Sequence, residues 1–214
     1  GASSGNTVGA ALADMNGDGK TDIITVSAYP DSLSIFPNNG QNNEISFSKK
    51  KDFQTGSDAV NVTTGDMDLD GIPDVACINA SAGTISVFKN ISKTDTIILK
   101  TRIDYSAGTG SQDLLLQDLN NDKKPELIVT NYNSNSMSVY LNKSTCGTIA
   151  FSDKKTFPTG NGPWYVRSTD IDGDKKPEVL TMNTASKTIS VLRNISSIDS
   201  ISFETKVDFS LPSS

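Results

Sequence analysis

The sequence predicts an all-β protein built as an array of four propeller blades, and three observations support this. First, an acidic loop followed by an apolar segment recurs every 52 residues, beginning at Asp14, Asp66, Asp118 and Asp170. Self-similarity at a period of this length indicates that each repeat is one supersecondary unit. Second, each repeat holds four short apolar segments separated by turns. Third, no segment shows helical periodicity. Four antiparallel strands in roughly 40 to 50 residues make one β-propeller blade.

The repeats fill the chain. Four copies account for 208 of the 214 residues, which leaves little room for a second domain. We therefore expect one propeller array over residues 1–214. Its blades are expected at about 7–56, 57–108, 109–160 and 161–210.

The first two strands of each repeat flank the acidic loop. The expected first strands are residues 8–13, 60–64, 114–117 and 165–169. The second strands follow the loop as continuous apolar runs, which are typical of strands buried on both faces. They are expected at residues 23–26, 75–78, 127–130 and 179–182.

The third and fourth strands complete each repeat. Residues 33–36, 85–88, 137–140 and 189–192 alternate apolar and polar side chains, which is the pattern of a half-buried strand. The fourth strands are expected to open at Ile45, Ile97, Ile149 and Ile201 and to end at Phe53, Tyr105, Phe157 and Phe209. The glycines that follow are expected to turn the chain into the next repeat; they are Gly56, Gly108 and Gly160.

The acidic loops carry oxygen-bearing side chains at positions 1, 3, 5 and 9, and position 7 offers a backbone carbonyl. A tight loop turns alternate side chains inward, so six or seven oxygens can be assembled when water is counted, and this suits Ca²⁺. We expect up to four Ca²⁺ ions, one in each repeat. The predicted ligands are Asp14, Asn16, Asp18, Lys20 and Asp22; Asp66, Asp68, Asp70, Ile72 and Asp74; Asp118, Asn120, Asp122, Lys124 and Glu126; and Asp170, Asp172, Asp174, Lys176 and Glu178.

Other metal sites fit the loops less well. The chain has no histidine and its cysteines lie outside the loops, which argues against the usual zinc and copper sites. An EF-hand requires a glutamate at position 12 and flanking helices. Position 12 holds Thr25, Cys77, Val129 or Thr181, and the flanks are strands. The remaining alternative is a set of turns stabilised only by their own side-chain hydrogen bonds.

The loops differ in ways that predict unequal sites. Position 6 is glycine in the first two loops but Lys123 and Lys175 in the others. If this position needs a positive φ, lysine carries a conformational cost there. Asn16 and Asn120 also lower the charge of the first and third loops. These differences predict that the second loop is the strongest site and the third the weakest.

The loop pattern D-x-[DN]-x-D-x-x-x-[DE] between two strands resembles the FG-GAP or VCBS-type repeat. The Phe-x-x-Gly turns at Phe53 and Phe157 belong to the same pattern, and Tyr105 begins a close variant. The resemblance implies Ca²⁺-carrying β-propeller blades like those of integrin α subunits and many secreted bacterial proteins. Such propellers usually close with seven blades. Four blades are then part of a longer propeller, half of an eight-bladed dimer, or a small closed ring, and we favour a part or an assembly.

Charge and composition exclude several classes of partner. The chain has 19 basic and 25 acidic residues, a net charge of −6, so it lacks the excess of basic residues that nucleic acids and anionic membranes require. No apolar stretch is long enough to insert into a membrane. Cys77 and Cys146 occupy different repeat positions, so we expect a buried and an exposed thiol rather than a disulfide.

We find no catalytic constellation and expect no enzyme activity. Histidine is absent, and the paired carboxylates are explained by the cation. The candidates for ligand binding are aromatic residues that depart from the repeat, namely Tyr29, Tyr132, Trp164 and Tyr165. Exposed aromatic rings stack on sugars and anchor protein partners. The alternative for Trp164 is a place in the core of the innermost strands.

Together these features predict a secreted or cell-surface module that is stabilised by calcium. Its expected role is adhesion to, or recognition of, a protein or a glycan. The alternatives are a sugar-binding lectin and an accessory domain of a larger secreted enzyme. The expected partners are the unidentified protein or glycan ligand, and either a second copy or the remainder of a longer chain.

Overall fold

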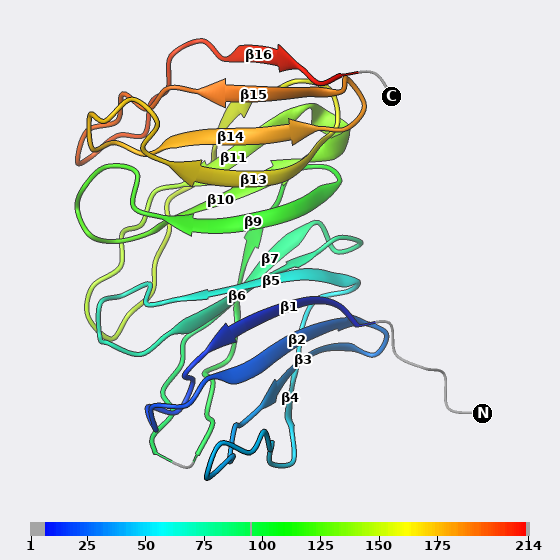
Figure 1. The fold of residues 1–214 in the computed structure, drawn as a ribbon, viewed down its shortest axis with the longest axis vertical. Coiled ribbons are helices and arrows are strands. Elements are labelled where there is room, and N and C mark those ends of the chain that lie inside the picture. Colours follow the sequence, from blue (N-terminus) through cyan, green and yellow to red (C-terminus); the bar gives the residue numbers. More distant parts are fainter. Residues whose placement is uncertain (1–6, 95, 213–214) are drawn as a thin grey trace. The chain divides into compact units, whose positions relative to one another are not determined.

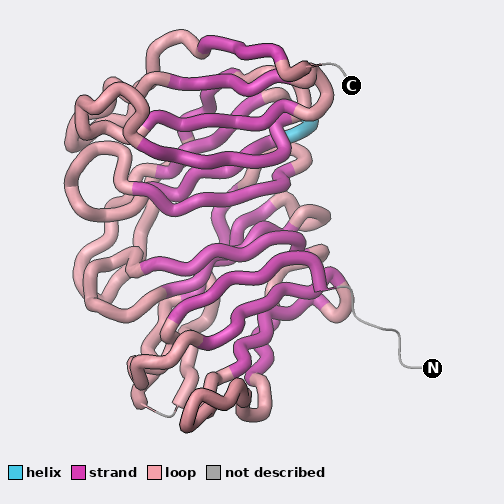
Figure 2. Tube along the Cα trace, in the orientation of Figure 1, coloured by secondary structure: helices cyan, strands magenta, loops and turns pink. Residues whose placement is uncertain are grey.

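Figures 1 and 2 show the computed structural model of the chain, which describes residues 7–94 and 96–212. These residues form four antiparallel sheets of four strands each. A single turn of 3₁₀ helix, η1 (Tyr132–Ser134), interrupts the strands. Among the described residues, no helix has the length and hydrophobicity needed to cross a bilayer. The predicted all-β class and the four strands per repeat are confirmed.

Each sheet is a meander in which the strands lie side by side in chain order. The strands of the first sheet are β1 (Thr7–Ala13), β2 (Asp22–Ala28), β3 (Asp31–Phe36) and β4 (Lys51–Gln54). Those of the second are β5 (Ala59–Gly65), β6 (Asp74–Asn79), β7 (Thr84–Phe88) and β8 (Ile103–Ser106).

The other two sheets repeat this arrangement. The third consists of β9 (Ser111–Gln117), β10 (Glu126–Asn131), β11 (Ser136–Tyr140) and β12 (Lys155–Pro158). The fourth consists of β13 (Pro163–Thr169), β14 (Glu178–Asn183), β15 (Thr188–Leu192) and β16 (Val207–Ser210).

The chain divides into two compact units. Unit 1 comprises Gly1–Ser106 with Cys146–Thr148 and holds the first two sheets. Unit 2 comprises Ala107–Thr145 with Ile149–Ser214 and holds the last two. Each unit therefore contains two blades.

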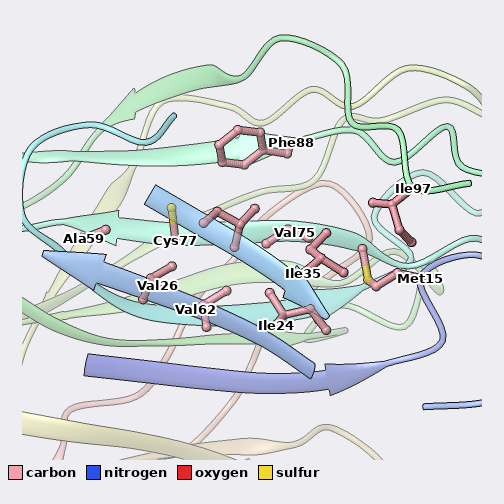
Figure 3. Packing of buried hydrophobic residues seen from close by; sticks show 11 residues of the cluster. Met15, Ile24, Val26, Ile35, Ala59, Val62, Val75, Cys77, Phe88 and Ile97 are labelled. Atoms are coloured by element: carbon pink, nitrogen blue, oxygen red, sulfur yellow. The ribbon is translucent and has the colours of Figure 1, made fainter. Parts of the chain in front are cut away.

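Apolar side chains from facing sheets fill the core of each unit. In unit 1, Ile24 and Ile35 of the first sheet join Val62, Val75 and Cys77 of the second (Figure 3). The core of unit 2 is built from the repeat equivalents, which are Ile128, Met137, Val139, Val166, Val179 and Leu192. All residues of β6 and of β10 are buried. This agrees with the continuous apolar runs of the sequence.

The fourth strands are shorter than the sequence predicts. The expected strand from Ile45 to Phe53 is regular only in β4, and Phe47 makes one isolated bridge to Asn38. The backbone N–H of Asn38 donates instead to the Asp22 carboxylate at 2.7 Å, so it does not extend the ladder. The same bridge recurs in the other repeats, at Asn90–Leu99, Asn142–Phe151 and Asn194–Phe203.

The innermost strands contain a bulge that the sequence did not reveal. The register of β13 against β14 shifts between Pro163 and Tyr165, which leaves Trp164 as the extra residue. Comparable shifts occur at Val8 in β1, at Val60 in β5 and between β9 and β10. A bulge interrupts side-chain alternation. The predicted starts of the third and fourth copies, at residues 114 and 165, are therefore late by three and two residues.

The glycines between repeats are required for a close approach. Gly56 donates its backbone N–H to the side-chain oxygen of Asn79 at 3.1 Å. A Cβ on Gly108 would lie 2.1 Å from Oδ1 of Asn131, the equivalent asparagine of the third repeat. The predicted turn glycines are thus needed because a buried asparagine packs directly against them.

Candidate metal centres

Each acidic loop connects the first and second strands of its sheet. The loop of the first sheet runs from Asp14, directly after β1, to Asp22, the first residue of β2. In each unit the two loops lie at the same end of their sheets, as Figure 1 shows for β1 and β5. The turns that carry Tyr29 and Tyr132 lie at the other end.

The aspartate at position 1 curls each loop by accepting backbone hydrogen bonds. Asp14 accepts from Gly17 and Gly19, both at 2.8 Å. Asp118 accepts from Asn121 and Lys123, again at 2.8 Å. The aspartate at position 5 accepts the N–H of position 7 in all four loops, at distances of 2.8 to 3.0 Å. The self-bonded turns of the alternative interpretation are therefore present, and they leave further carboxylate oxygens available.

The carboxylate at position 9 joins two parts of the blade. In the second loop, Asp74 accepts the N–H of Met67 at 3.1 Å and that of Asn90 at 2.8 Å. Burial raises the pKa of Asp74 to about 6 and that of Glu126 to about 7. Neighbouring loop carboxylates contribute to both shifts, because they disfavour a further negative charge. A bound cation would offset this repulsion.

Carboxylates converge in two of the loops. Asp66, Asp68 and Asp70 can bring one oxygen each to within 4.8 Å of one another. In the fourth loop, Asp170, Asp172 and Glu178 do the same. Asp68 is buried, and its Oδ2 accepts no hydrogen bond although it forms an ion pair. All-oxygen sets of this kind suit a hard cation.

Two basic residues at these loops escaped the sequence analysis. The Lys89 ammonium contacts Asp68 and Asp70, and the Arg193 guanidinium contacts Asp172 and Asp174. Each residue directly follows the third strand of its sheet. The sequence does contain a signal for them. Only the second and fourth repeats have a basic residue at this position, and the first and third have Pro37 and Leu141.

Position 6 has a left-handed backbone in every loop, so the two lysines do carry the conformational cost considered above. Gly19 and Gly71 have φ of 82° and 87°, and Lys123 and Lys175 adopt 73° and 68°. Position 4 is also left-handed in every loop, which the sequence analysis missed. Its residues are Gly17, Leu69, Asn121 and Gly173.

The aromatic candidates do not form one site within a single unit. In unit 2 the rings of Tyr132 and Trp164 meet edge to face, with centroids 5.6 Å apart. Trp164 is 41% exposed, so it is not the core residue of the alternative interpretation, and the bulge explains why. Tyr165 is 47% exposed and lies 5.9 Å from the Arg167 guanidinium. Tyr29 belongs to unit 1 and is 62% exposed.

The profile of the FG-GAP-like repeat matches residues 14–77 and 118–181. Each match contains two acidic loops and together they cover more than half of the chain. The chain belongs to the FG-GAP-like repeat family. A search of curated proteins gave no significant match to this FG-GAP chain.

Solved structures share the propeller fold of this FG-GAP chain. A putative 6-phosphogluconolactonase from Bacteroides fragilis has a TM-score of 0.67 at 17% identity, over 96% of this chain and 56% of that one. One from Bacteroides uniformis has a TM-score of 0.67 at 17% identity, over 98% and 57%. Virginiamycin B lyase from Staphylococcus aureus has a TM-score of 0.57 at 14% identity, over 97% and 56%. The FG-GAP chain thus spans little more than half the length of these propellers.

Proposed function

We propose that this chain is a calcium-stabilised, non-catalytic propeller module of a secreted or cell-surface protein, which recognises a protein or a glycan. The observation that carries the calcium part is the acidic loop that recurs between the first and second strands of all four sheets, with oxygen-bearing side chains at positions 1, 3, 5 and 9. The residues at positions 1, 3 and 5 would hold the ion, and position 9 would support them. A bound cation would neutralise the crowded carboxylates and fasten the turn between the first two strands.

Thermal unfolding tests the role of calcium. After EDTA treatment and dialysis, millimolar Ca²⁺ should raise the unfolding midpoint by roughly 5–10 °C, because an ion that binds only the native state stabilises it. Mg²⁺ should raise it less, since the smaller ion demands stricter octahedral geometry. A midpoint that does not respond to Ca²⁺, in protein shown to carry no metal, would remove calcium from the proposal.

The recognition part rests on the exposed Trp164, which lies at the end of the blade opposite the acidic loops. An aromatic ring held by an edge-to-face neighbour, Tyr132, offers a rigid face for a sugar or a protein side chain. A lectin and an accessory domain of a larger secreted enzyme remain the alternative roles. Saturable glycan binding would support the lectin, and a catalytic domain in the same polypeptide would support the accessory role.

A glycan array with wild type and Trp164→Ala tests this surface. We expect the variant to lose at least tenfold in affinity for a bound glycan or protein, with an unchanged unfolding midpoint. Ile45→Ala is the control, because Ile45 is exposed at the acidic-loop end of unit 1. Equal loss in both variants, or no loss in Trp164→Ala, would contradict the assignment.

We also propose that these four blades are part of a seven-bladed ring. On the fourth sheet, cross-strand pairs align Tyr165, Met182, Ile189 and Phe209 in one row. The equivalent row of the first sheet is Gly9, Val26, Leu33 and Phe53, whose last three members pack against the second sheet. Another blade would cover the row in the same way. Four of seven blades amount to about 57% of a ring. This is close to the 56–57% of the similar propeller chains that this chain covers.

A further inference from the structure

The side chain of Lys89 occupies the second acidic loop. Its Nζ lies 2.8 Å from Oδ2 of Asp68, 2.5 Å from Asp70 and 3.8 Å from Asp74. Lys89 is only 7% exposed. The ammonium donates hydrogen bonds to the carboxylates of Asp68 and Asp70. The residue is therefore a buried ammonium ion among carboxylates at positions 3, 5 and 9.

A divalent cation and this ammonium cannot share the loop. Both would contact the same oxygens of Asp68 and Asp70, so the two positive charges would lie within a few ångströms of each other in a buried setting. Their repulsion is strong where water screens it poorly. Ca²⁺ can enter only if the Lys89 side chain leaves, which exchanges one cation for another at the same carboxylates.

The fourth loop has a basic residue at the same repeat position. Arg193 Nε lies 2.7 Å from Asp172, and Nη2 lies 3.6 Å from Asp174. Arg193 also pairs with Glu204 at 3.2 Å and its side chain is 50% exposed. Arg193 thus contacts the carboxylates at positions 3 and 5, but it is more exposed than Lys89 and lies farther from the position-5 carboxylate.

The first and third loops lack a basic side chain at this repeat position. Asn16 and Asn120 replace the position-3 aspartate there, and Pro37 and Leu141 replace the basic residue. Thus the extra carboxylate and the extra positive charge occur together in two repeats and are absent together in the other two. At the first loop, a hollow opens beside Asn16, Asp18 and Pro37. Lys20, Lys49 and Lys51 also line it, and the Lys51 ammonium donates to the carbonyl of Ile97 at 3.1 Å.

We infer that Lys89 and Arg193 are the resident cations of the second and fourth loops, and that divalent cations bind only the first and third. This inference rests on the proposed calcium binding and specifies which loops carry it. It reverses the order that carboxylate number predicts, in which the second loop is strongest. Two repeats are then held together independently of calcium.

Calcium titration of metal-free protein by calorimetry tests the inference. We expect two sites in the wild type and three in Lys89→Met, which removes the ammonium and keeps an unbranched side chain one atom shorter. Lys93→Met is the matched control, because Lys93 is exposed in the same repeat, and it should keep two sites. Pro37→Lys introduces the basic residue into the first loop and should remove one site or weaken it at least tenfold.

The outcomes separate the inference from the proposed function. Four sites in the wild type, or an unchanged number in both Lys89→Met and Pro37→Lys, would overturn the inference and leave calcium binding intact. No binding in any variant would overturn the calcium proposal itself. If Lys89→Met folds only in the presence of Ca²⁺, that result supports the inference, because the metal then replaces the missing ammonium. If it folds in neither condition, Pro37→Lys decides.

Discussion

At the scale of single residues, the loops are governed by backbone conformation as much as by charge. Position 4 requires a left-handed conformation, which glycine and asparagine adopt easily and leucine does not. Leu69 nevertheless holds this position with a φ of 59° and an exposed side chain. Asn121 holds the equivalent position with a φ of 62°. Leu69 is thus a strained residue with no evident gain from burial.

Replacing Leu69 by asparagine should therefore stabilise the protein. The left-handed conformation costs a side chain like leucine about 1–2 kcal/mol, and asparagine recovers part of this. We expect a rise of about 2–4 °C in the unfolding midpoint, measured by circular dichroism. Leu69→Ala is the control, since it removes the exposed apolar side chain but keeps a Cβ without a polar group. Equal midpoints for the two variants would show that strain is not the cause.

The cysteines provide a second prediction at this scale. Burial raises the pKa of the Cys77 thiol to about 12, whereas Cys146 is exposed. The thiolate is the reactive form, so Cys77 should be inert in the native state at pH 8. Ellman's reagent should detect one fast thiol in native protein and two after denaturation. Cys146→Ser should have no fast thiol, and a second fast thiol in native wild type would contradict the burial of Cys77.

At the scale of elements, one asparagine in the second blade of each unit ties that blade to the first. Asn194 donates its side-chain amide to the carbonyl of Leu119 at 2.8 Å and to that of Pro177 at 3.0 Å. Asn90 makes the equivalent bonds to Met15 and Pro73 in unit 1. Both asparagines start N-x-Ser sequences, which resemble glycosylation sites. Their burial and paired amides indicate a structural role instead.

Asn194→Ala should weaken the packing of the two blades in unit 2. It leaves two carbonyl acceptors without their donor in a buried setting, which costs about 1–3 kcal/mol for each unsatisfied group. Urea denaturation should show a loss of roughly 2–6 kcal/mol in the free energy of unfolding. Asn38→Ala is the control, because the Asn38 amide reaches only Thr21 of its own blade at a more exposed position. A loss in Asn38→Ala as large as in Asn194→Ala would exclude the inter-blade bond as the cause.

At the scale of the whole molecule, the sequence predicted what the repeat encodes locally. The continuous run at residues 75–78 and the alternation at residues 85–88 were enough to place β6 and β7. The bulge at Trp164 was not predictable, because it depends on pairing with a second strand. The role of Lys89 was missed for a related reason. Its partner Asp68 is 21 residues away, and only the fold brings them together.

The open face of the fourth sheet supplies the last prediction. Met182 and Phe209 are 41% and 55% exposed, and they lie in one cross-strand row with Tyr165 and Ile189. An apolar row of this kind is a site of association when no blade covers it. The chain produced by itself should therefore self-associate at micromolar concentration, which light scattering would detect as a mass above that of the monomer.

Met182→Glu should restore the monomer mass, because a charge in the middle of the row resists desolvation. Ile45→Glu adds the same charge at an exposed residue outside the sheets and should leave self-association unchanged. The remaining blades of a longer chain would have the same effect as Met182→Glu without a new charge, since they would cover the row. A wild type that stays monomeric at all concentrations would contradict self-association through this apolar row. It would then favour closure of four blades by themselves over a seven-bladed ring.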